Sequence, residues 1–257
     1  MVKLLLDIGK VDIDCKDYYD RMPLLYAAEN GYENMVKLLL DTGKVDIDAT
    51  DNNGKTPLFA AVRNGHESIV KLLLNTGAVN INKSDSQHRT PISYAVESGY
   101  ESMVKLLLDT GKIDVGYQDD EGLTPFSYAC LERHESIMKL LLDAGKVDLN
   151  HKDDKGMSPF WMAASAGCEA VVKQILDTSK VDLKCEMDYW LCPDNKWCDH
   201  EGVVKLLVER YADMKIDIPP EAEDHILKRW PGLLESTGNF SHGELKSAVC
   251  EGMVLMS

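Results

Sequence analysis

The chain has 257 residues with 43 acidic and 28 basic side chains, which gives a formal net charge of -15 at pH 7. Nucleic acids and anionic membranes require surfaces rich in Lys and Arg, so this balance argues against both and favours a basic or apolar partner. No run approaches the roughly 18 apolar residues of a membrane-spanning helix, and the run at residues 4–6 is too short for a signal peptide, so we expect a protein of the cytoplasm or nucleus that is not secreted.

The predicted elements recur along the chain at a fixed interval. Glycines spaced 34 residues apart stand at Gly9, Gly43, Gly77, Gly111 and Gly145, and Ser179 takes the next place. Prolines follow at the same spacing, at Pro23, Pro57, Pro91, Pro125, Pro159 and Pro193. A period in this range predicts a solenoid of stacked units rather than a globule with a single core.

The chain enters the first unit at the second helix of the pattern, at residues 2–6. We therefore expect either that the array is cut from a longer one or that another segment covers this face. Each complete unit then begins with a turn, for example at residues 51–54, and Thr56 and Pro57 predict the start of a first helix. Gly65 should end that helix, and a second helix should run over residues 66–74. The apolar residues of this second helix lie on too many sides for a helix that exposes one face to solvent. We therefore expect the helix to be buried between neighbouring units.

This pattern of a β-turn, Thr-Pro-Leu, two antiparallel helices and a Gly resembles the ankyrin repeat. The variant Gly-Lys-Val-Asp-Ile-Asp, as at residues 43–48, resembles ankyrin arrays of filamentous fungi. The resemblance implies an all-α ankyrin-repeat solenoid, with paired antiparallel helices joined by β-turn fingers. It covers residues 1–215 in about six repeats, the first partial and the last degenerate. Residues that depart from the pattern are Met22 in place of Thr, and Arg133, His88 and Trp190 in place of Gly.

The pattern ends near residue 216. Residues 216–257 predict a helical C-terminal extension or cap, with helices over 221–230 and 243–256. We leave two interpretations open: this tail covers the last repeat, or it folds toward the binding groove and closes one end.

No phosphate loop, nucleophile elbow or dinucleotide fingerprint occurs, so we predict no cofactor. Cys185, Cys192, Cys198 and His200 lie close in sequence, but they lack the paired ligand spacing that is usual for zinc. We predict no metal and interpret the seven cysteines as reduced thiols. His66, His134 and His200 share one repeat position, which indicates residues at the starts of helices.

Candidate binding residues are those that vary while the repeat frame stays constant. In ankyrin proteins the turn tips and first helices form a concave binding face. The predicted ligand-binding set is Tyr18, Tyr19, Arg21, Lys55, Phe59, Arg89, Leu123, Met157, Trp161, Tyr189 and Trp190. The residues before each cap change from basic to apolar along the array, so we expect ligand contact to concentrate at the apolar end. The alternative for Trp161 and Tyr189 is that they pack beneath the tail.

Two functions remain open at this stage. The first is a binding scaffold that recognises a protein, peptide or other ligand through the concave face. The second is a cofactor-independent cyclase or isomerase, acting on a small hydrophobic substrate in a pocket between the last repeats and the tail. Asp120, Glu121 and Asp154 would then supply acid and base. We favour the scaffold, because a fold alone does not supply catalysis.

Overall fold

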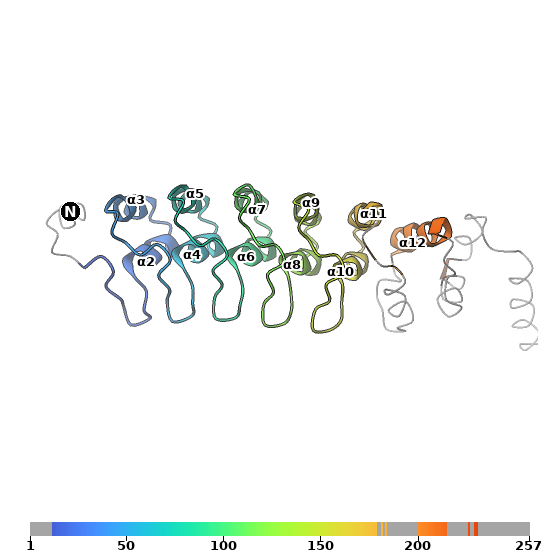
Figure 1. The fold of residues 1–257 in the computed structure, drawn as a ribbon, viewed down its shortest axis with the longest axis horizontal. Helices are drawn as coiled ribbons and strands as arrows, with labels where there is room; N and C mark the ends of the chain where they lie inside the picture. Colours follow the sequence, from blue (N-terminus) through green and yellow to red (C-terminus); the bar gives the residue numbers. More distant parts are fainter. Residues whose placement is uncertain are drawn as a thin grey trace, which may run out of the picture. The chain divides into compact units, whose positions relative to one another are not determined.

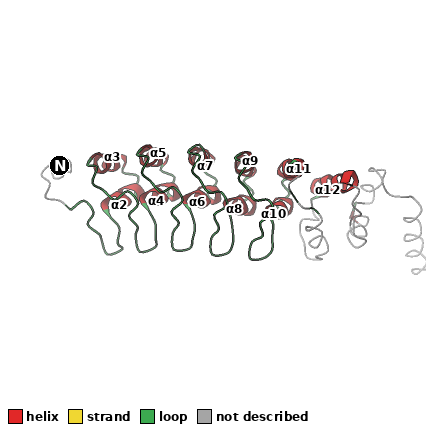
Figure 2. Ribbon diagram, in the orientation of Figure 1, coloured by secondary structure: helices red, strands yellow, loops and turns green. Residues whose placement is uncertain are grey.

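The computed structural model describes residues 12–178, 181, 183, 200–214, 226, 229 and 230. The chain divides into two compact units, residues 1–162 and 163–257, and each is considered by itself. The described residues form eleven α-helices and contain no strand, as Figure 2 shows. The predicted all-α class is therefore confirmed. None of these helices combines the length and the apolar character that crossing a membrane would require.

Four complete helix pairs make up most of the first unit. The pairs are α2 (Pro23–Glu29) with α3 (Glu33–Asp41), α4 (Pro57–Arg63) with α5 (Glu67–Asn75), α6 (Pro91–Glu97) with α7 (Glu101–Leu108), and α8 (Pro125–Leu131) with α9 (Glu135–Asp143). The first helices of successive pairs pack on one another, α2 on α4, α4 on α6 and α6 on α8, and each packs on its own second helix. Figure 1 shows that the loops between pairs extend away from the second helices. We call these loops fingers. The predicted solenoid of paired helices is thus confirmed.

The first helices start as the sequence predicts, although the caps differ in detail. Thr56 Oγ1 accepts the backbone N–H of Phe59 at 3.1 Å, and Thr124 forms a reciprocal capping box with Ser127. Such bonds satisfy amides that the first helical turn leaves without partners. Thr90 does not make the expected bond to the backbone, because its hydroxyl instead lies 3.0 Å from the Ser93 hydroxyl. The Met22 side chain lacks an oxygen that could accept a backbone N–H, so α2 has no side-chain cap.

The second residue after each first helix adopts the left-handed conformation that the pattern predicts. Gly31 has a φ of 74°, and a Cβ there would lie 2.8 Å from the ring of His66 in the next repeat. His66 precedes α5, and its Nε2 lies 3.1 Å from the Glu29 carbonyl oxygen. The small residue and the ring thus connect neighbouring repeats. Arg133 takes the same conformation at the equivalent position, with a φ of 57°.

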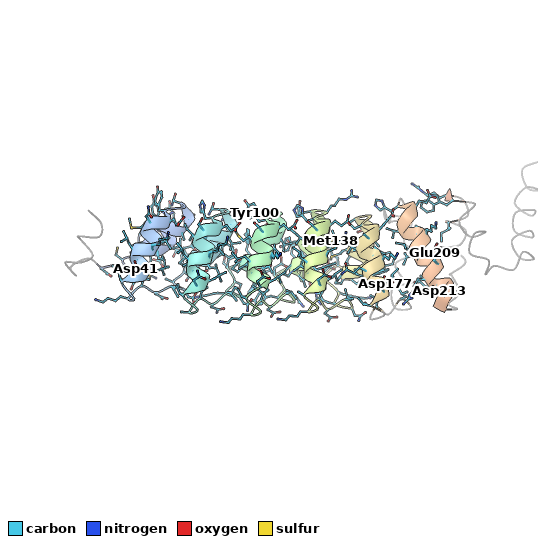
Figure 3. The ribbon with its side chains drawn as sticks, turned by 90° about the horizontal axis from the view of Figure 1, so that it is seen from above. Asp41, Tyr100, Met138, Asp177, Glu209 and Asp213 are labelled. Atoms are coloured by element: carbon cyan, nitrogen blue, oxygen red, sulfur yellow. The ribbon has the colours of Figure 1, made fainter. Side chains whose placement is uncertain are left out.

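The second helices pack side by side, with their apolar faces turned into the array. Figure 3 shows α3, α5, α7 and α9 in a row, with Asp41 at the end of α3 and Tyr100 at the start of α7. Leu73 and Leu107 are fully buried, which confirms the predicted burial between units. Leu74 and Leu106 are partly exposed, so the apolar surface is not covered on every side as we expected.

The fingers are also tied to one another by backbone bonds. The N–H of Asn52 donates to the Tyr19 carbonyl at 3.1 Å, and the N–H of Ser86 donates to the Asn53 carbonyl at 2.8 Å. Further along the finger, both carboxylate oxygens of Asp48 accept the N–H of Asn80. The backbone bonds hold successive fingers in register without depending on the varying side chains, and the Asp48 bond adds to them.

Helix α10 (Pro159–Ser165) spans the boundary between the units, and the second unit contains α11 (Glu169–Asp177) and α12 (Glu201–Met214). α12 packs on α11. His200 Nε2 lies 3.2 Å from the Ser165 carbonyl oxygen, and the Tyr211 hydroxyl donates to the Leu183 carbonyl at 3.0 Å. The predicted boundary at residue 215 and the two helices of the C-terminal tail fall largely outside the described residues and stay predictions.

Candidate binding face

The residues expected before each cap lie at the junction of finger and first helix. Arg21, Lys55, Arg89 and Met157 are partly exposed, whereas Leu123 is buried. The apolar residues of this set, Leu123 and Met157, therefore expose less surface to a ligand than the sequence suggested. Tyr189 and Trp190, expected at the same end, lie outside the described residues, as do Cys185, Cys192 and Cys198. Elsewhere in the described chain, no three His, Cys, Asp or Glu side chains gather as a metal site would require.

Phe59 and Trp161 do not lie on the surface where we expected them. Their exposed fractions are 0% and 1%, so the expectation that they form exposed anchors is wrong. Phe59 packs edge-on against Tyr94 of the next repeat with ring centroids 4.7 Å apart, and Trp161 packs against Phe160 at 5.7 Å. Both occupy the third position of a first helix, which points into the core rather than toward solvent.

Most of the exposed aromatic residues in the described part of the chain lie instead on the first complete repeat. Tyr18 and Tyr19, both predicted, are 90% and 58% exposed, and their rings contact each other edge-on at 5.3 Å. Tyr26 and Tyr32, which we did not predict, are 46% and 53% exposed, with ring centroids 6.3 Å apart. The expected concentration of exposed aromatics at the C-terminal end is therefore not what the described residues show.

A repeated tyrosine in the sequence marks the helix position that carries the aromatic rings of this surface. Tyr26, Tyr94 and Tyr128 all stand three residues after the proline that opens a first helix. The predicted set instead contains the position two residues after the proline. One residue of an α-helix turns the side-chain direction by about 100°. The predicted position is buried, whereas its neighbour is exposed at Tyr26, partly exposed at Tyr94 and buried at Tyr128.

Arginines stack on these rings. The Arg89 guanidinium lies between two of them, 3.8 Å from the Tyr94 centroid and 4.6 Å from the Tyr128 centroid. Arg63, which belongs to the preceding repeat, lies 5.7 Å from the Tyr94 centroid. Arg21 lies 5.2 Å from the Tyr19 ring and 5.3 Å from the Tyr26 ring. We call the surface made by Tyr19, Arg21, Tyr26, Arg63, Arg89, Tyr94 and Tyr128 the tyrosine–arginine face.

Two of these arginines are neutralised by carboxylates of their own repeat. Arg21 bonds Asp17 at 2.8 Å and Glu29 at 3.1 Å, and Arg89 forms an ion pair with Glu97. Burial opposes the charge of Arg89, but the bond to Glu97 and the two tyrosines outweigh it and raise the pKa of Arg89. Its Nε is buried without a hydrogen-bond partner. Arg89 is therefore held in place mainly by stacking and by one carboxylate.

Tyr128 is the least exposed tyrosine of the face. Its hydroxyl donates to Asp119 Oδ2 in the turn of the same repeat. Burial and this bond to a carboxylate raise the pKa of Tyr128, so the phenol stays neutral and acts as a hydrogen-bond donor. It connects the finger to the first helix and braces the ring against which Arg89 stacks.

The carboxylates proposed for an acid–base reaction are exposed on finger tips. Asp120 Oδ1 lies 2.6 Å from His88 Nδ1 of the preceding finger, and the N–H of Asp154 donates to the Glu121 carbonyl at 3.5 Å. All three side chains are open to water, which weakens any electrostatic effect on a reacting group. The pocket beside the C-terminal tail that the enzyme hypothesis requires involves residues outside the described ranges.

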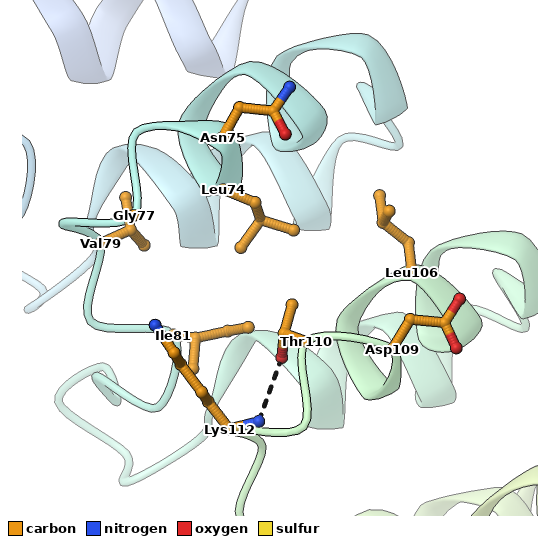
Figure 4. A pocket seen from close by; sticks show the side chains of 9 residues that line it. All are labelled: Leu74, Asn75, Gly77, Val79, Ile81, Leu106, Asp109, Thr110 and Lys112. Carbon is orange, nitrogen blue, oxygen red and sulfur yellow. Dashed lines mark hydrogen bonds between the residues drawn. The ribbon is translucent and has the colours of Figure 1, made fainter.

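An open pocket of about 350 Å³ lies on the side of the second helices, between α5 and α7 and the loops that follow them. Figure 4 shows the side chains of Leu74, Val79, Ile81 and Leu106 around it, with Asp109 and Lys112 at its edge. The Lys112 N–H donates to Thr110 Oγ1 at 3.3 Å, which shapes one wall. No predicted site residue lines this pocket.

Comparison with protein families identifies the repeat type. A model described as ankyrin repeats (3 copies) matches residues 43–119 and 111–186, and one described as ankyrin repeats (many copies) matches residues 5–59. No curated protein matches the chain.

Proposed function

Because the chain belongs to the ankyrin-repeat family, we propose that it is a binding scaffold that recognises a protein or peptide through the tyrosine–arginine face. Ankyrin repeats generally mediate protein–protein binding. The family supplies the class of function, and the residues of this chain must supply the site.

The observation that carries the proposal is the composition of the face. Tyrosine and arginine are enriched among the residues that dominate binding energy, because they combine a large contact area with polar groups. Here the exposed rings of Tyr19 and Tyr26 flank the Arg21 guanidinium. A partner covering them would remove substantial apolar area from water while still meeting hydrogen-bond donors at its edge.

The face is also held in shape before a partner arrives. Backbone bonds join successive fingers, and the stacked rings and ion pairs restrict the arginine side chains. Ordering a long side chain on binding costs about 0.5–1.5 kcal/mol. Stacked arginines have already lost much of that freedom, so a larger part of the contact energy appears as affinity.

The proposal can be tested with peptides from a random library displayed on phage and selected on the wild-type protein. We expect the Tyr19→Ala/Tyr26→Ala double variant to bind selected peptides about tenfold more weakly or worse, while its circular dichroism melt stays nearly unchanged. Lys105→Ala serves as the control, because Lys105 is exposed on α7 and lies outside the face. Peptides that bind the double variant as well as the wild type would contradict the proposal.

A further inference from the structure

Two repeats of the tyrosine–arginine face share one ion-pair geometry. Arg21 pairs with Glu29 in the first complete repeat, and Arg89 pairs with Glu97 in the third. In both repeats the arginine precedes the cap, and the glutamate stands eight residues later at the end of the first helix. Since the two copies agree, the repeat frame itself brings side chains at these positions together.

The repeat between them places cations at both positions. Lys55 stands where Arg21 and Arg89 stand, and Arg63 stands where the two glutamates stand. Of the ion pairs and side-chain hydrogen bonds within the described residues, none involves the Lys55 ammonium or the Arg63 guanidinium. Asp51 occupies the place of Asp17, and the Oδ1 atom of each accepts two backbone N–H groups of its own turn. Asp17 also pairs with Arg21, whereas the ion pairs of the described residues include none between Asp51 and Lys55.

Arg63 is exposed, and its guanidinium stacks over the Tyr94 ring at 5.7 Å. The ring restricts the guanidinium from one side and leaves its N–H groups free to bond a ligand. The frame that brings Arg21 to Glu29 and Arg89 to Glu97 would bring the Lys55 ammonium and the Arg63 guanidinium toward the same place, where a carboxylate could accept bonds from both. An anion placed between them would also relieve the repulsion of two like charges.

We propose that Lys55 and Arg63 form a carboxylate-binding site at the centre of the face, which takes one Asp or Glu side chain of a bound peptide. This inference rests on the proposed function, because it assumes a peptide lying on that face. Glu29 and Glu97 each place a carboxylate against the arginine that stands where Lys55 stands. The neighbouring repeats thus show that a carboxylate fits beside a cation at this place in the repeat.

The surroundings narrow the partner further. Glu29 and Glu97 lie in the repeats on either side, and the whole chain carries a net charge of -15. A polyanion would find the arginines of both neighbouring repeats already paired and would be repelled by the net charge of the chain. A single carboxylate beside apolar residues meets two cations and the neighbouring tyrosine rings. The net charge of the chain favoured a basic partner, but the local arrangement selects a segment with one acidic side chain.

Arg63→Glu provides the sharpest test, because it gives the second repeat the charge pattern of its neighbours. The introduced carboxylate should then pair with the Lys55 ammonium within the protein and occupy the site. We expect peptides selected on the wild type from a phage-displayed random library to share an Asp or Glu next to an apolar residue. Displayed through their C-termini, they have no free terminal carboxylate, so a side chain must supply it. Their affinity for Arg63→Glu should fall about tenfold or more.

Lys55→Glu should have the same effect, since the carboxylate introduced there would pair with Arg63. The acid and the cation would then stand in exchanged positions. Replacing the peptide's acid by its amide should abolish the difference between wild type and Arg63→Glu, as a double-mutant cycle requires for a direct contact. Lys105→Glu, the same charge change on α7, should bind like the wild type. If Arg63→Glu melts early, Arg63→Gln removes the charge with a smaller change and should lower affinity in the same direction.

The outcomes separate this inference from the proposed function. Peptides that require Tyr19 and Tyr26, but carry no acid or bind Arg63→Glu as tightly as the wild type, would overturn the carboxylate site and leave the binding face in place. Peptides that ignore every variant would overturn both.

Discussion

Tyr128 shows how one repeat position changes its chemistry along the array. Its equivalent Tyr26 is exposed and Tyr94 is partly exposed, but Tyr128 is buried and bonds Asp119. A buried hydroxyl without a partner would be costly, and the turn carboxylate removes that cost. The same residue type therefore provides contact surface in one repeat and internal bracing in another.

Tyr128→Phe should lower the free energy of unfolding by about 1–2 kcal/mol at neutral pH, because a buried bond to a charged acceptor is lost. The folded state raises the pKa of Tyr128, so above about pH 10 the unfolded chain loses this proton first and folding weakens. The deficit of the variant should therefore shrink as the pH rises above about 10. Urea unfolding from about pH 7 to about pH 11 measures both effects.

Tyr18→Phe is the matched control, because Tyr18 is almost fully exposed. It should change stability by less than about 0.5 kcal/mol at any of these pH values. A pH-independent deficit in Tyr128→Phe would show that the raised pKa does not contribute to stability.

Arg133 holds a left-handed conformation that its repeat equivalents assign to glycine. A side chain in this region costs about 1–2 kcal/mol, and the greater freedom of glycine in the unfolded chain offsets part of the gain. Arg133→Gly should therefore stabilise the protein by about 0.5–1 kcal/mol in urea melts. Arg133→Ala retains the strain and should give no such gain; equal effects of the two changes would point to the arginine side chain instead.

At the level of the helix, the first-helix caps are unequal. Thr56 caps α4 and Thr124 caps α8, but Met22 leaves the equivalent amide of α2 without a side-chain acceptor. The second helices are more uniform, and each starts with a glutamate in its first turn, where a negative charge favours the helix dipole. The stability of a repeat should therefore vary mainly with its first helix.

Met22→Thr should stabilise the array by about 0.5–2 kcal/mol, since the hydroxyl would accept the free amide at the start of α2. Thr56→Ala should destabilise it by a similar amount. Thermal melts of both variants test the pair, with Met22→Ala as a control that changes size without adding an acceptor. A Met22→Thr protein no more stable than Met22→Ala would show that this cap is not what α2 lacks.

At the level of the first unit, each repeat packs mainly on its neighbours, so stability should be close to a sum of repeat and interface terms. Removing residues 51–84 deletes one complete period and joins Thr50 to Asp85, which restores the repeat frame because Asp85 takes the place of Asp51. The shortened protein should fold cooperatively with a lower melting temperature. Circular dichroism should show a helical content per residue near that of the full chain.

Removing residues 51–67 is the contrasting deletion, because it removes half a period and brings the remainder of α5 to the place of a finger. The apolar faces would then no longer match, and we expect most of the helical signal to be lost. Equal behaviour of the two deletions would mean that the 34-residue frame is not the unit of folding.

The local steps of the fold could be predicted from residues alone. The 34-residue period, the Thr-Pro starts and the left-handed position at Gly31 depend on short stretches of chain, and the structure agrees with them. Arg133 departs from the glycine pattern and nevertheless keeps the left-handed conformation. Such features follow from backbone geometry and neighbouring side chains, which the sequence states directly. Tyr18, Tyr19 and Arg21 were also predicted as binding residues, and as such they stay predictions.

Tertiary packing alone decided which side chains form the face. Phe59 and Trp161 are buried while Tyr26 is exposed, although their positions differ by a single step along equivalent helices. That step turns the side chain by about 100°, and the side that faces solvent is decided by the repeats on either flank. The contrast between the Arg21–Glu29 pair and the two cations Lys55 and Arg63 likewise becomes visible only once the finger and the first helix are folded together.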